Sequence, residues 1–132
     1  MLARIPFTDI TREIIASAIE VHRVLGPGLL ESVYFRCLQY ELSARRLPFM
    51  TEHRVPIVYK GHALDCEYRL DLIVDNAVVV EAKALSGLLP VHQAQLLTYL
   101  KLTGLPVGLL INFNVPKLVT GVERVINPNA ST

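Results

Sequence analysis

The stretch YRLDLIVDNAVVVEAKAL, residues 68–85, is the most informative part of the sequence for the topology of this chain. Its last apolar run, residues 78–80, consists of three valines and is typical of a buried strand. Residues 75–77, Asp-Asn-Ala, favour a turn between this run and the apolar residues before it. The stretch therefore predicts a β-hairpin that carries three charged residues close together, Asp71, Glu81 and Lys83.

The first strand of the hairpin shows a clear alternation over residues 62–74. One face is predicted to carry Leu64, Cys66, Tyr68, Leu70 and Leu72. The other face is predicted to carry Asp65, Glu67, Arg69 and Asp71. A shift of one residue in the pairing turns every side chain of a strand to the opposite face, so the register decides where the charged residues point.

The length of the turn sets this register. A two-residue turn points Glu81 and Lys83 into the apolar face. A three-residue turn pairs Asp71 with Glu81 and Ile73 with Val79, and it gathers the polar side chains on one face. Because an uncompensated charge is costly to bury, the three-residue turn is the register that we predict.

The predicted register brings two carboxylates together, and these repel each other unless a cation lies between them. Hard oxygen ligands suit Mg²⁺ or Mn²⁺. Lys83 lies one step beyond Glu81 on the same face, where a lysine can orient a water or neutralise charge on a phosphate. The residues alone leave a second interpretation open, in which the three charges form surface salt bridges.

Two helices are predicted before the hairpin and one after it. Residues 9–25 place apolar side chains on one stripe, at Ile10, Ile14, Ala18, Val21 and Leu25. Residues 29–46 are predicted as a second helix with inward side chains at Leu30, Val33, Cys37, Leu38 and Leu42. Residues 89–103 are predicted as the third, with Pro90 in its first turn and Gly104 past its end.

The remaining strands complete one sheet. Residues 53–59 predict a strand, which Pro56 places at an edge. Residues 106–113 predict a buried strand, and residues 115–127 are ambiguous, with a strand favoured at residues 121–126. The order helix, helix, three strands, helix, strand predicts a central mixed sheet flanked by helices, of the α/β or α+β class.

Composition bounds the kind of protein. The length suits a single domain, residues 1–132, and the 52% hydrophobic content predicts apolar surface covered by a second copy, hence a homodimer. A net charge of +1 shows no global basic excess, so any nucleic-acid surface must be local. Cys37 and Cys66 lack metal-site spacing and are predicted to be buried thiols in a reducing compartment. No signal sequence or apolar run of about 18 residues is present, so we expect a cytoplasmic protein without a membrane span.

Three motifs carry a resemblance to a known superfamily. Asp71 followed by Glu81-Ala82-Lys83 on the next strand resembles the motif of the PD-(D/E)XK nucleases. Gln95 and Tyr99 resemble the QxxxY motif of RecB-like members, and GLLESVY, residues 28–34, matches the signature of the small GxxExxY family. The resemblance covers roughly residues 10–115, and Leu70 stands where the superfamily name has its proline.

The resemblance implies a restriction-endonuclease-like core and a metal-dependent phosphodiesterase that acts on DNA or RNA. Asp71, Glu81, the backbone carbonyl of Ala82 and Glu31 are implied ligands of Mg²⁺ or Mn²⁺. Lys83 is implied to position or activate the water. Gln95 and Tyr99 are implied to align the strand to be cleaved.

Some of these residues also have structural interpretations. Glu31 suits the start of a helix, where an acid complements the helix dipole. Tyr34 either binds substrate or packs in the core. His92 is a substrate-binding candidate that also fits the polar flank of an amphipathic helix. Two alternative functions stay open for the whole chain, a non-catalytic nucleic-acid-binding or assembly module and a hydrolase of small phosphodiesters.

Overall fold

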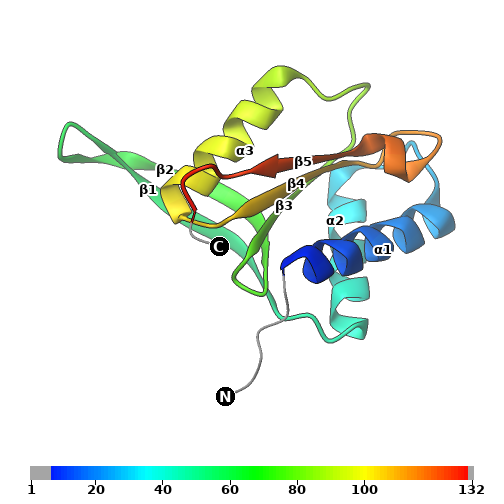
Figure 1. Cartoon of the computed structure of the whole chain (residues 1–132). Helices are drawn as coiled ribbons and strands as arrows, with labels where there is room; N and C mark the ends of the chain where they lie inside the picture. Colours follow the sequence, from blue (N-terminus) through cyan, green and yellow to red (C-terminus); the bar gives the residue numbers. More distant parts are fainter. Residues whose placement is uncertain (1–6, 131–132) are drawn as a thin grey trace, which may run out of the picture.

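The computed structural model describes residues 7–130, which form three helices and one mixed sheet of five strands (Figure 1). The elements follow one another as α1 (Phe7–Leu25), α2 (Glu31–Ala44), β1 (Phe49–Tyr59), β2 (His62–Val74), β3 (Val78–Lys83), α3 (Pro90–Thr103), β4 (Val107–Asn112), the short 3₁₀ turn η1 (Leu118–Gly121) and β5 (Val122–Ile126). The predicted class and element order are confirmed, and so is the strand favoured at residues 121–126.

The strands lie in the sheet in chain order, from β1 at one edge to β5 at the other. All neighbouring pairs are antiparallel except β3 and β4, which are parallel. Parallel neighbours need a crossover connection, and α3 provides it. Pro56 therefore lies on an edge strand, as predicted.

Helices cover both faces of the sheet. Figure 1 shows α1 and α2 on one face of the sheet and α3 on the other. One apolar cluster joins side chains of α1 and α2 to the sheet, and a second, smaller cluster joins α3 to the opposite face. Every residue of β4 is buried, and β3 is buried as far as Ala82. A strand covered on both faces has no polar side, which explains the continuous apolar runs in these two segments.

The predicted stripe of α1 is confirmed, because Ile10, Ile14, Ala18 and Val21 are all buried. The stripe predicted for α2 is wrong in its first turn, where Leu30 and Val33 are exposed. The helix begins at Glu31, and its buried residues follow the i, i+4, i+8 spacing of Tyr34, Leu38 and Leu42. The tyrosine takes the inward position that the sequence pattern gave to aliphatic residues.

The hairpin of β1 and β2 extends away from the body of the protein (Figure 1). Lys60 and Gly61 form its turn, both with positive φ, as a two-residue hairpin loop requires. Leu64 and Cys66 are exposed here, so the predicted burial of the Cys66 thiol is wrong. Alternation identifies two faces of a strand, but only the part of β2 next to β3 lies against the core.

The alternation of β2 is interrupted at the acid of interest. Leu70 belongs to the cluster under α3, whereas Leu72 belongs to the cluster under α1 and α2, so the two do not share a face as predicted. The pairing with β1 passes from Thr51↔Leu72 to His53↔Leu70, and Glu52 between them has a φ of 53°. A residue in this left-handed region departs from regular strand geometry.

Gly121 marks a contact between backbones, which gives a first testable prediction. A Cβ at Gly121 would clash with the carbonyl oxygen of Asn112, so Gly121→Ala should lower the free energy of unfolding by about 1–3 kcal/mol through overpacking. Gly87→Ala is the matched control, because a Cβ there meets nothing within 4 Å. Chemical denaturation that finds the two variants equally stable would contradict this packing.

Candidate active site

The hairpin between β2 and β3 has the register predicted from the sequence. Ile73 pairs with Val79, and Val74 pairs with Val78 across a three-residue turn in which Asp75 and Asn76 have positive φ. Leu72 pairs with Val80, and the same register carried one pair beyond it sets Asp71 opposite Glu81. The side chains of the two acids hydrogen-bond to each other. The two predicted acids are therefore direct neighbours on adjacent antiparallel strands.

Burial dominates the electrostatics of this acid pair. Glu81 is 6% exposed, and its Oε1 atom has no hydrogen-bond partner within the described chain. Burial, followed by the charge of Asp71, raises the pKa of Glu81 to about 8, while Lys83 acts in the opposite direction. Burial also raises the pKa of Asp71. Without a cation, the site therefore retains a proton on Glu81 near neutral pH.

Lys83 and Glu31 border the acid pair. The Nζ atom of Lys83 lies 3.8 Å from Oε2 of Glu81, and its side chain is 22% exposed, so it faces both the acids and solvent. Glu31 is the exposed first residue of α2. The pKa of Glu31 is raised, mainly by partial burial; the charge of Lys83 lowers it and the charge of Asp71 raises it. Glu31 is therefore close enough to interact electrostatically with both site residues.

The predicted third carboxylate ligand is not in place. Across residues 7–130, no group of three His, Cys, Asp or Glu side chains lies close enough to hold a metal ion, so Glu31 does not join Asp71 and Glu81. Two carboxylates still suit Mg²⁺, which keeps several waters and takes phosphate oxygens as further ligands. The unpartnered Oε1 of buried Glu81 is the atom for which a cation would compensate. The residues present therefore fit a hard divalent ion.

The raised pKa of Glu81 predicts how metal-free stability depends on pH. Between the ordinary value of 4.5 and about 8, the folded state binds a proton that the unfolded state has released. The free energy of unfolding should therefore fall as pH rises through this interval and level off above it. Denaturation curves across the interval, compared with those of Glu81→Gln, test this. A wild-type slope no steeper than that of Glu81→Gln would contradict the buried acid.

α3 brings a tyrosine to the same place. The ring of Tyr99 meets the ring of Tyr68 edge-to-face, with centroids 4.9 Å apart and planes at 79°. The pKa of Tyr99 is raised by its burial and by the charges of Glu81 and Asp71, which places it beside the acid pair. Gln95 lies one helical turn earlier and is exposed. Of the predicted pair on α3, Tyr99 therefore lies beside the acids, and Gln95 is exposed to solvent.

Tyr68 is a neighbour of the site that sequence reasoning missed. It appeared only as one apolar member of the alternation in β2, with no motif attached. The break in that alternation near Asp71 leaves Tyr68 and Leu70 on the α3 side, where Tyr68 supports Tyr99. The only signal in the sequence was that Tyr68 lies three residues before Asp71 on the same strand. Such a spacing is too common to identify a site residue.

Two residues predicted to bind substrate make structural contacts within the fold. Tyr34 is fully buried and stacks on Phe113 with centroids 4.6 Å apart. Its hydroxyl donates to the carbonyl of Gly26 and accepts from the N–H of Leu29, so it holds the turn between α1 and α2. The Nδ1 atom of His92 accepts from the N–H of Leu89 and caps α3. Both polar groups therefore already have partners within the fold.

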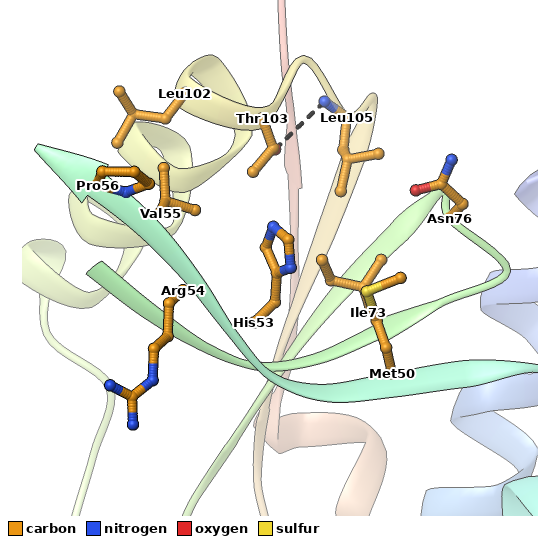
Figure 2. A pocket seen from close by; sticks show the side chains of 10 residues that line it. All are labelled: Met50, His53, Arg54, Val55, Pro56, Ile73, Asn76, Leu102, Thr103 and Leu105. Carbon is orange, nitrogen blue, oxygen red and sulfur yellow. Dashed lines mark hydrogen bonds between the residues drawn. The ribbon is translucent and has the colours of Figure 1, made fainter. Parts of the chain in front are cut away.

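A surface hollow of about 220 Å³ lies elsewhere, between β1 and the end of α3 (Figure 2). His53, Ile73 and Thr103 are among the side chains that line it, whereas the guanidinium of Arg54 points away. None of the residues predicted for the site lines this hollow. The acid pair is therefore separate from it.

Comparison with known proteins agrees with the geometry of the site. Residues 8–125 match the family model described as the PD-(D/E)XK nuclease superfamily, whose members generally use divalent metals. No curated protein and no solved structure matches the chain. No helix in the described part of the chain is long and apolar enough to cross a membrane. Because the match extends over most of its length, the chain belongs to the PD-(D/E)XK nuclease superfamily.

Proposed function

We propose that this protein is a metal-dependent nuclease that hydrolyses phosphodiester bonds of DNA or RNA at Asp71, Glu81 and Lys83. The observation that carries the proposal is the unpartnered, buried Oε1 of Glu81 beside a second carboxylate. A site that serves only to stabilise the fold would not leave a buried carboxyl oxygen unpartnered beside a second, half-buried acid. Membership of the superfamily supports the same chemistry.

Asp71 and Glu81, with the backbone carbonyl of Ala82, are the proposed ligands of Mg²⁺ or Mn²⁺. A bound divalent ion supplies positive charge to the phosphate oxygens and lowers the pKa of a coordinated water. The carboxylate pair would fix the position of the ion, because strands β2 and β3 hold the two acids next to each other. Glu31 borders the site and adds negative charge at its edge.

Lys83 is the proposed group that acts on the reacting atoms. Its N–H donors can orient the attacking water or stabilise charge on a phosphate oxygen. In hydrolysis the water oxygen bonds to phosphorus and one ester P–O bond breaks, which leaves a phosphomonoester and a free hydroxyl. Tyr99 and Gln95 on α3 are proposed to align the substrate across the acid pair.

A substrate panel tests the proposal. Single-stranded and duplex DNA, the same sequences in RNA, and a small phosphodiester should be incubated with Mg²⁺ or Mn²⁺, with Asp71→Asn as the inactive control. We expect cleavage of at least one nucleic acid by the wild type and none by the control. Cleavage of the small phosphodiester alone would identify a small-molecule hydrolase, and binding without any cleavage would identify a nucleic-acid-binding module.

The homodimer stays a prediction, and exposed apolar side chains on α1 and α2 support it. Val24 is 65% exposed, and Tyr40 is 75% exposed. Sedimentation should show a dimer at micromolar concentration, because burying such side chains favours association. The double variant Val24→Ser and Tyr40→Ser should shift the protein toward monomer. A wild-type protein that sediments only as a monomer would contradict the prediction.

A further inference from the structure

A buried asparagine lies beside the proposed catalytic lysine. Asn112 is the last residue of β4, is 2% exposed and pairs with Lys83 in the register of the parallel strands. Its Oδ1 accepts from the N–H of Leu85 at 3.0 Å and from the N–H of Asn114 at 3.2 Å. Its Nδ2 donates to the carbonyl of Leu85 at 3.0 Å. One side chain therefore satisfies both backbone polar groups of Leu85.

These hydrogen bonds hold the backbone that follows the last residue of β3. The regular ladder between β3 and β4 ends at Lys83 and Asn112, and the N–H of Phe113 still donates to the carbonyl of Lys83 at 2.9 Å. Two residues later, the amide of Asn112 pairs with Leu85 as a neighbouring strand would. The backbone of Lys83 is consequently held in the ladder itself and immediately after it.

We propose that Asn112 is a positioning residue for Lys83, which it holds in place through the backbone at Leu85. The inference rests on the proposed nuclease function. Reaction rates fall steeply when a reacting group is displaced by about 1 Å. The Nζ of Lys83 lies 3.8 Å from Glu81, and freedom of the segment after β3 would let this separation vary. Asn112 does not touch substrate or metal in this scheme.

The chain contains a matched comparison for this role. Asn127 is also buried, at 5% exposure, and its Nδ2 donates to the carbonyls of Leu100 and Leu105 at 3.0 Å each. Its Oδ1 accepts from the N–H of Asn129. Asn127 follows Ile126, which pairs with the first residue of β4. Asn112 is the last residue of β4. The two asparagines therefore make similar bonds near opposite ends of β4.

The experiment compares Asn112→Ala with Asn127→Ala at a temperature where both are folded. We expect both substitutions to lower stability, because each leaves backbone groups without partners. Asn112→Ala should lower kcat by about tenfold or more with little change in KM, whereas Asn127→Ala should retain the wild-type kcat. Equal losses in both variants, or no loss in either, would overturn the proposal. If Asn112→Ala does not fold, Asn112→Ser provides the same comparison.

Hydrogen exchange of single amides provides a readout that needs neither metal nor substrate. Asn112→Ala should abolish the protection of the Leu85 N–H, and Asn127→Ala should leave it unchanged. Unchanged protection in Asn112→Ala would overturn the proposal regardless of activity. If the wild type cleaves none of the substrates tested, the proposed function fails. In that case a selective loss of protection at Leu85 still supports the anchoring of the segment that follows Lys83.

Discussion

Lys83→Ala is expected to lower turnover of a cleaved nucleic acid by about a hundredfold or more, the usual scale for losing one preorganised catalytic group. The substitution removes an N–H donor that lies 3.8 Å from Glu81 and partly faces solvent. It removes no carboxylate, so binding of Mg²⁺ should be similar or slightly stronger once a positive charge has left the site. Cleavage kinetics and calorimetric Mg²⁺ titration measure the two effects separately.

Lys101→Ala is the matched control, because Lys101 is exposed in the last turn of α3. It should retain wild-type turnover. Lys83→Arg should restore only part of the activity, since a guanidinium is larger and does not give up its proton. Wild-type turnover in Lys83→Ala would show that the reaction does not use this lysine. Loss of Mg²⁺ binding in the same variant would mean that Lys83 holds the site together rather than acting on the substrate.

The register of one hairpin was predictable because its energetics are local. The three-residue turn was the alternative that sets Asp71 beside Glu81, and the structure has the pairs that this turn requires, although Glu81 is buried and not on an open polar face. The strand β4 was also predictable, because it is apolar up to Asn112 and a continuous apolar run is typical of a strand buried on both faces. Both inferences used residues close together in the sequence, where only a few alternatives compete.

The features that local sequence patterns did not indicate depend on tertiary contacts. Tyr34 packs on Phe113, 79 positions later in the chain, and no local pattern indicates that contact. The exposure of Cys66 follows from how far the β1–β2 hairpin extends beyond the helices. Motif spacing thus located the acid pair, whereas the groups around the pair could be identified only from the packed structure.

Mg²⁺ should raise the stability of the wild type, and Glu81→Gln should remove most of that gain. A cation that binds only the folded protein adds about 2.7 kcal/mol to the free energy of unfolding at a hundredfold excess over its Kd. The measurement belongs above pH 8, because the pKa of Glu81 is raised to about 8 and protons compete with the metal below that value. Asp65→Asn, an exposed acid on β2, is the control and should show the full gain.

Without metal, the same substitution should act in the opposite direction. Above pH 8 the wild type buries an ionised Glu81 whose Oε1 has no partner and whose neighbour is another carboxylate. A neutral amide of the same shape removes that repulsion, so metal-free Glu81→Gln should be more stable than the wild type. The wild type should then respond to Mg²⁺ while the variant stays nearly unchanged. General damage to the fold cannot produce this combination, because it would lower stability in both conditions. An equal response of both proteins to Mg²⁺ would place the metal elsewhere and refute Glu81 as its ligand.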